Sequence, residues 1–362
     1  MDGRSETGNV TLRPTDFHEL SDWQDDDHAA ALAAFRRGAE ILGVHPPKRR
    51  ALGLDPEALA AIMARAAALP SDISSREARL FFEAEFAPAL IEAEAFFTGY
   101  YEPVVEGSRT PSPDFPVPLY RTPEDLVEIE PGSVAGLDPT FRFAKKTAAG
   151  LVEHPDRGAI MTGALLGREL ELVYLRDQVE AFFVQVQGAA RVRLREGGEM
   201  RITYAAKTGH PYTSIGKVLI ETGALEPGGV TMQTLRAWLA EHPEAMPGVL
   251  VKNRSYVFFR EAPVGDATLG PIAAAKVPLT AGRSLAVDRL IHSFHTPVFV
   301  ETTLPDGGAW RRLMIAQDTG SAIVGPARGD IFFGSGDAAG AIAGAMRGGG
   351  RFFLLMPRGS RP

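Results

Sequence analysis

The feature that most constrains the fold is a change in sequence pattern near Phe96. After this point Pro and Gly interrupt short runs rich in Val, Phe, Tyr and Thr, a pattern typical of β strands joined by many turns. Before it, the chain carries helix signals instead. We therefore expect N-terminal helices followed by a mainly β chain. The 362 residues suit two or three domains, since a domain has roughly 150 residues.

The N-terminal helix signals are caps. Asp27 and Asp55 each precede an Ala- and Leu-rich segment, and Ser74 with Glu77 has the spacing of a capping box. The expected helices are Ala29–Leu42, Ala58–Leu69 and Ala78–Phe86.

The later part of the chain contains two blocks of candidate strands separated by two helices. The strands of the first block are Phe141–Lys146, Leu170–Leu175, Glu180–Val186, Ala190–Leu194 and Met200–Tyr204. The strands of the second are Ser255–Arg260, Ser284–Asp288, Pro297–Glu301, Arg311–Ala316, Ile331–Phe333 and Arg351–Met356. The expected helices are Ser214–Thr222, Thr231–Glu241 and, inside the second block, Ala338–Met346. We expect an N-terminal helical segment over residues 1–105 that joins the last domain, an inserted β domain over 106–240, and a β-barrel domain over 241–362.

Composition excludes several classes of protein. The chain has no cysteine, which excludes disulfides, cysteine zinc sites, thiolate nucleophiles and a lipid anchor on this polypeptide. A net charge of −7 argues against a nucleic-acid partner. No apolar run has the length of a transmembrane segment. The first residues lack the pattern of a signal peptide, so we expect either a cytosolic protein or one whose targeting segment is absent from this chain.

Three aspartates stand at the ends of strand-like runs. Asp288 and Asp318 each end a run, and Asp330 begins one. A single Asp in such a place is usually a turn former, but three of them favour a site at the rim of a barrel. A carboxyl group held among Ile331 and its aromatic neighbours would stay protonated near neutral pH and could act as a general acid. A second, ionised Asp could stabilise positive charge on a sugar ring, so the pair suits glycoside cleavage.

Asp318-Thr319-Gly320 also matches the Asp-Thr-Gly motif of aspartic proteases. The motif occurs once, so a protease would have to be a symmetric dimer. His210, His292 and His295 lack the spacing of metal ligands, and we expect no metal and no organic cofactor.

A second group of residues suits carbohydrate, because tyrosine faces stack on sugars while amides and hydroxyls bind their hydroxyl groups. These residues lie in three segments near turns and helix starts. The candidates are Thr98, Tyr100, Gln187, Gly188, Tyr204, Lys207, His210 and Tyr212.

The same segments resemble the membrane-bound lytic murein transglycosylase A family. The matching stretches are TGYYEPV at 98–104, PLYR at 118–121, VQVQG at 184–188, YAAKTGHPYTSIGKVL at 204–219, SYVFF at 255–259, VPL at 277–279 and the segment 318–334. The resemblance implies a double-psi β-barrel, a second inserted β-barrel-like domain and a glycan cleft between them.

The resemblance also implies an activity. It assigns catalysis to Asp330, a supporting role to Asp318 and a structural role to Asp288. The expected reaction cleaves the β-1,4 bond between N-acetylmuramic acid and N-acetylglucosamine in peptidoglycan and leaves a 1,6-anhydromuramoyl end. The expected partners are peptidoglycan strands and complexes of cell-wall synthesis or hydrolysis, and the expected location is the periplasm, in association with the outer membrane. The alternatives are an inverting glycoside hydrolase on the same barrel, the dimeric aspartic protease and a non-catalytic glycan-binding module.

Overall fold

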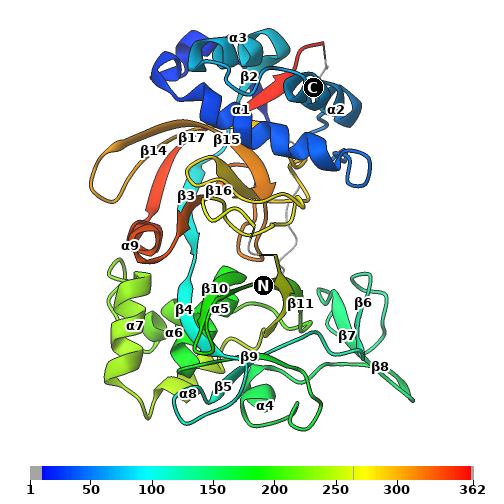
Figure 1. Cartoon of the computed structure of the whole chain (residues 1–362), viewed down its shortest axis with the longest axis vertical. Coiled ribbons are helices and arrows are strands. Elements are labelled where there is room, and N and C mark those ends of the chain that lie inside the picture. Colours follow the sequence, from blue (N-terminus) through cyan, green and yellow to red (C-terminus); the bar gives the residue numbers. More distant parts are fainter. Residues whose placement is uncertain (1–9, 264, 360–362) are drawn as a thin grey trace. The chain divides into compact units, whose positions relative to one another are not determined.

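The computed structural model describes residues 10–263 and 265–359, which form two compact units (Figure 1). Unit 1 comprises Met1–Tyr101 and Asp266–Pro362, and unit 2 comprises Glu102–Gly265. This division corrects the expected boundaries at 105/106 and 240/241. Residues 241–265 belong to unit 2 because strand β12 (Val257–Ala262) pairs with β11 (Glu199–Lys207) of that unit.

Unit 1 contains a sheet of eight strands in the order β1-β2-β17-β14-β15-β13-β16-β3. Because β17 also pairs with β3, the six strands from β17 to β3 close into a barrel. The strands are β1 (Leu12–Pro14), β2 (Phe86–Ile91), β3 (Ala95–Glu102), β13 (Ser284–Val287), β14 (Pro297–Thr303), β15 (Ala309–Asp318), β16 (Arg328–Ser335) and β17 (Arg347–Pro357). All six expected strands of the second block are therefore present, although Ser255–Arg260 corresponds to β12 of unit 2. Strands β1, β2 and β3 were not predicted. Strands β1 and β2 extend the barrel sheet beyond β17.

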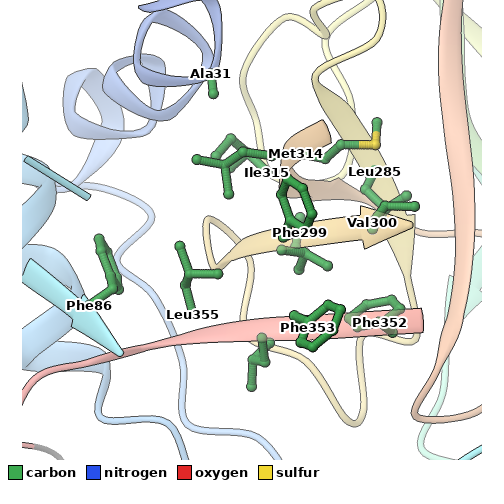
Figure 2. Close-up of a cluster of buried hydrophobic side chains, with 14 of the residues drawn as sticks. Ala31, Phe86, Leu285, Phe299, Val300, Met314, Ile315, Phe352, Phe353 and Leu355 are labelled. Carbon is green, nitrogen blue, oxygen red and sulfur yellow. The ribbon is translucent and has the colours of Figure 1, made fainter. Parts of the chain in front are cut away.

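Helices of unit 1 pack against the barrel through a large apolar core. They are α1 (His28–Arg37), α2 (Pro56–Ala67) and α3 (Ser75–Glu85), with short 3-10 helices at Phe17–Glu19, Trp23–Asp25 and Gly38–Ile41. Helix α9 (Asp337–Ala345) lies outside this core and packs against β16. The core joins α1 to the barrel, as Figure 2 shows for Ala31, Phe299, Ile315, Phe353 and their neighbours. Burial of these large side chains is the main stabilising contribution to the unit.

The predicted caps form. Asp27 accepts a hydrogen bond from the Ala30 amide, and Ser74 with Glu77 makes a complete capping box. The first helix is shorter than expected, because the α-helix ends at Arg37 and a 3-10 turn continues it.

Unit 2 is built on a sheet in the order β12-β11-β10-β4-β9-β5, whose edge strands β12 and β5 lie close together. The sheet is therefore strongly curved, in agreement with the expected barrel-like domain. Its other strands are β4 (Val104–Ser108), β5 (Val117–Tyr120), β9 (Glu171–Leu175) and β10 (Ala189–Leu194). A separate sheet contains β6 (Leu126–Glu128), β7 (Phe143–Thr147) and β8 (Gly150–Val152). The helices are α4 (Arg157–Met161), α5 (Gln178–Gln187), α6 (Ile215–Glu221), α7 (Met232–Glu241) and α8 (Met246–Leu250).

The strand predicted at Glu180–Val186 is wrong, because this segment forms helix α5. Its Phe and Val residues favour a strand locally, but both ends carry helix caps. The Asp177 carboxylate accepts a hydrogen bond from the Glu180 amide, and Gly188 ends the helix with a φ of 78°. The helix buries Phe182, Phe183 and Val184, so tertiary packing favours it.

Within the described ranges, no helix is both long and apolar enough to cross a membrane.

Candidate active site

Asp318 and Asp330 lie on the two strands that flank β13, and both are in register with the same residue of β13, Ala286. Asp318 is the last residue of β15 and pairs in parallel register with Ala286 of β13. Asp330 lies on β16 and pairs with the same Ala286 in antiparallel register. Residues in register on neighbouring strands point to the same face, and two strand spacings of about 4.8 Å separate these Cα atoms by about 10 Å. The structure thus brings the two carboxyl groups to one face of the sheet.

Asp330 is held through one oxygen only. The Thr98 hydroxyl donates a short hydrogen bond to Asp330 Oδ1, and Arg328 Nη2 donates to the Thr98 oxygen over 2.6 Å. Because the Arg328 bond occupies the Thr98 oxygen, the hydroxyl hydrogen points to Asp330. In the described part of the chain, Oδ2 of Asp330 accepts no hydrogen bond. This oxygen is therefore the one available to carry a proton to a ligand.

Asp318 is held through both oxygens. Its Oδ1 accepts from the backbone amides of Thr319 at 2.8 Å and Ala274 at 3.2 Å. Its Oδ2 accepts from the Tyr100 hydroxyl at 3.0 Å. Three donors favour the ionised form of a carboxyl group.

Burial is the largest influence on both carboxyl groups. Burial, with a smaller contribution from the charge of Asp330, raises the pKa of Asp318 to about 6 against the lowering by its three donors. Burial also raises the pKa of Asp330, while Arg328 and the Thr98 hydroxyl lower it. Two interacting carboxyl groups with raised pKa values are typical of acid–base sites.

Strand β3 supplies Thr98 and Tyr100 to the site. Gly99 lies between them and lets β3 pack closely against Phe333 and Ala343. A Cβ at Gly99 would lie 2.6 Å from the Phe333 ring and 2.9 Å from the Ala343 Cα. The Tyr100 ring packs on Phe332 with centroids 5.3 Å apart. Any larger residue at position 99 would have to displace the Phe333 ring and the backbone of α9 at Ala343.

Asp288 lies next to the site but binds only backbone. Its carboxylate accepts from the amides of Leu290 at 2.9 Å and Gly325 at 3.0 Å. It thereby ties the loop after β13 to the loop that connects Asp318 with Asp330. These contacts support the structural role that the resemblance implies.

The remaining predicted contacts lie in unit 2. Gly188 ends α5, and its carbonyl accepts from the Tyr204 amide at 2.7 Å, which places Gln187 and Tyr204 near each other. Lys207 ends β11. The Tyr204 and Tyr212 side chains are 42% and 39% exposed, so both rings can take part in stacking.

His210 is different, because it is buried within unit 2 with 1% exposure. Its Nε2 donates to the His154 carbonyl at 2.8 Å, and its ring packs against Phe141. The surroundings therefore give this side chain a packing role, and no surface for a ligand.

Arg328 and Ala286 were not predicted as site residues. Arg328 lies two positions before Asp330, so its charge was a usable signal, whereas Ala286 is recognisable only from the strand register. Among the described residues, no group of three or more His, Asp or Glu side chains could hold a metal ion.

The fold and the site together define a class: a closed β-barrel protein, interrupted by a second β domain, with two half-buried carboxyl groups on one barrel face. The chain belongs to the membrane-bound lytic murein transglycosylase A family. The MltA specific insert domain matches residues 96–260, and the 3D domain matches residues 283–356. These matches confirm the resemblance and, with the related structures, the double-psi barrel with an inserted domain.

Solved structures of relatives cover nearly the whole chain, whereas the chain spans just under two thirds of the curated relatives it matches. A membrane-bound lytic murein transglycosylase from Agrobacterium tumefaciens is 45% identical, with a TM-score of 0.90 over 96% of this chain and 98% of that one. The structure of Escherichia coli MltA with bound chitohexaose is 27% identical, with a TM-score of 0.67 over 96% and 92%. The curated membrane-bound lytic murein transglycosylase A of E. coli K12 is 33% identical over 268 residues, which are 72% of this chain and 65% of that protein.

Proposed function

We propose that this protein is a peptidoglycan lytic transglycosylase. It would cleave the β-1,4 bond between N-acetylmuramic acid and N-acetylglucosamine and leave a 1,6-anhydromuramoyl end. The observation that carries the proposal is the difference between the two carboxyl groups. Among the described residues, Asp330 has one oxygen held by Thr98 and one without a partner, whereas Asp318 has donors on both oxygens.

In the first step Asp330 acts as the general acid. Its raised pKa keeps a proton available, and Oδ2 gives that proton to the glycosidic oxygen as the bond to the muramoyl C1 breaks. Asp318, held ionised by three donors, stabilises the oxocarbenium-like transition state.

In the second step Asp330, now a carboxylate, accepts the proton of the C6 hydroxyl of the same muramoyl residue. The C6 oxygen bonds to C1 and closes the anhydro ring, so Asp330 is protonated again and no water is consumed. The step needs no second base. Asp318 suits that scheme, since its three donors leave little capacity to activate water, as an inverting hydrolase would require.

The glycan contacts are part of the proposal. We assign the exposed Tyr204 and Tyr212 rings to stacking on sugars, and Gln187, Gly188 and Lys207 to hydrogen bonds with them. Thr98 and Tyr100 would act through the aspartates that they hold. His210 would contribute only by supporting its neighbours.

The location and partners follow from the same proposal. The relatives are named membrane-bound murein enzymes, which supports action on peptidoglycan strands in the periplasm, near the outer membrane. Association with cell-wall synthesis or hydrolysis complexes is proposed on the same basis.

The test is digestion of murein sacculi by wild type, Asp330→Asn and Asp337→Asn, with mass analysis of the sugar ends. Asp337 is an exposed acid in the first turn of α9, so its variant is the matched control. We expect anhydro ends from wild type and the control, and a rate lowered about 10²- to 10⁴-fold by Asp330→Asn. Ends heavier by one water would identify a hydrolase. Wild-type activity in Asp330→Asn would contradict the proposal, and absence of cleavage by wild type would favour a binding module.

A further inference from the structure

We propose that unit 2 contains a second ligand site, which binds an acylated amino acid or peptide end through its carboxylate. The site is a cavity of about 360 Å³ between β5, α4 and α5. This volume lies within the range of small-molecule sites. Nothing in the proposed cleavage reaction uses the cavity.

Arg157 is the charged group of the cavity. It is the first residue of α4 and is only 3% exposed. Its Nε donates to the Asn253 carbonyl at 2.8 Å and its Nη2 to the Ser255 carbonyl at 2.6 Å. The guanidinium lies over the Phe182 and Tyr256 rings, at 4.7 and 5.4 Å from their centroids. Its position is therefore set by both backbone and aromatic contacts.

The charge of Arg157 has no counter-ion in the described residues, and its Nη1 donates no hydrogen bond there. Other buried arginines of this chain have acidic partners, as Arg283 has Asp26 and Arg201 has Glu102. Burial lowers the pKa of Arg157 to about 10, so the side chain remains charged at neutral pH. An unpaired buried cation is costly. An anion bound in the cavity would remove that cost.

Two amide oxygens of α5 give the cavity its second preference. Gln178 and Gln185 lie on one face of the helix and line the cavity. Among the described residues the Oε1 atom of each is buried without a hydrogen-bond partner, and the Gln185 amide is positioned by a side-chain hydrogen bond with Tyr256. Gln185 is 5% exposed. These oxygens accept hydrogen bonds, so the matching ligand has N–H groups beside its anionic group.

The rest of the lining is apolar and includes Ile160, Met161, Leu166 and Leu250. A carboxylate, an adjacent amide N–H and a small apolar side chain occur together at the carboxyl end of a peptide. Inorganic phosphate lacks both the N–H donors and the apolar part. If the proposed function holds, a source for this chemistry is the peptide stem of murein, which ends in D-alanine; the site itself does not depend on that function.

The test is calorimetric titration of the full chain with N-acetyl-D-alanine, N-acetyl-L-alanine and N-acetyl-D-alaninamide. We expect at least one of the two N-acetylalanines to bind. The uncharged amide should bind about 10- to 100-fold more weakly, because it cannot form the charged hydrogen bond. Preference for the D-acid would assign the source to murein stems, and preference for the L-acid to the carboxyl end of an ordinary protein. Equal binding of acid and amide, or no binding of either acid, would overturn the proposal.

Three variants locate the binding. Leu166, 71% exposed at the cavity, can be replaced by Trp to fill it without disturbing the core. We expect Leu166→Trp to abolish binding and Val152→Trp, at an exposed position of β8 outside the cavity, to leave it unchanged. Arg157→Met should also abolish binding, and its thermal unfolding shows whether it folds. Undiminished binding by Leu166→Trp would overturn the assignment. Binding is measured without any cleavage, so failure here is distinct from failure of the sacculus digestion.

Discussion

Tyr100 donates a hydrogen bond to Asp318 over 3.0 Å, from a ring that is itself packed on Phe332. This contact connects the first strand of the barrel, β3, with the end of β15. It also lowers the pKa of a carboxyl group that burial raises to about 6. The protonation of Asp318 in the active pH range therefore depends on a tyrosine far from it in sequence.

Tyr100→Phe tests this dependence. Without the hydroxyl the pKa of Asp318 rises, so Asp318 becomes ionised only at higher pH. If cleavage needs ionised Asp318, we expect the acidic limb of the pH–rate profile on sacculi to move up by about 1 to 2 units, the value of a hydrogen bond to a charged group. Tyr174→Phe, on β9 of unit 2, is the matched control. An unmoved acidic limb would separate Asp318 from the ionisation that controls the rate.

Thr98→Val removes the hydroxyl between Arg328 and Asp330. The Thr98 bond lowers the pKa of Asp330, so its loss raises that pKa and moves the alkaline limb of the profile up. We also expect the maximal rate to fall about 10-fold, because Oδ1 is no longer held. Thr98→Ser keeps the hydroxyl and should therefore keep both the maximal rate and the position of the alkaline limb close to those of wild type. Equal loss in the Ser and Val variants would indicate a purely steric role.

Asp318→Asn should make folding stability less dependent on pH. The folded pKa of Asp318, about 6, lies above its usual value of 3.8, so the wild type loses stability as pH rises through this window. The loss is up to about 3 kcal/mol. The Asn side chain can keep the bonds of Thr319 and Ala274 through its oxygen. In urea unfolding, the free energy of unfolding of the variant relative to wild type should be higher at pH 7 than at pH 4. The same relative value at both pH values would contradict this.

The buried ion pair of Asp26 and Arg283 should be needed for folding of unit 1. Both N–O distances are 2.8 Å, and Asp26 also accepts from the Leu313 amide at 2.7 Å. Arg283→Met leaves a buried charge without its partner, which should cost about 3–5 kcal/mol in urea unfolding. Adding Asp26→Leu should recover part of that loss.

The control for that experiment is an exposed pair of the same chemistry. Arg109 and Glu261 are 46% and 48% exposed, so Arg109→Met should cost less than about 1 kcal/mol. Similar costs for Arg283→Met and Arg109→Met would remove the special role of burial.

Much of the fold could be predicted from local signals. The caps at Asp27, Asp55 and Ser74 are all formed, since a cap depends on a side chain and amides only two or three residues away. The strand at Glu180–Val186 was mispredicted because its Phe and Val residues favour a strand, while the helix depends on its caps and on burial of three consecutive side chains. Strand β2 lacked a local signal of comparable strength, and its pairing with β17, more than 250 residues away in sequence, stabilises it.

The candidate site was also only partly predictable from sequence. Asp318, Asp330, Thr98 and Tyr100 could be selected from sequence because their residue types and motifs carry the chemistry. Their roles could not, because Asp318 and Asp330 become distinct only through the donors that surround them.

The sequence by itself determined the residue types available for catalysis, the absence of cysteine chemistry and the order of helical and β segments. The tertiary structure alone decided that Ala286 would have an aspartate on each side. It also decided that Asp318 would accept hydrogen bonds from three donors and Asp330 from a single donor among the residues described. It also decided that Arg157 would be buried with no counter-ion in the part of the chain that the structure describes. The physical reason is that register, desolvation and hydrogen bonding depend on segments far apart in the chain, which only the closed barrel and the folded insert bring together.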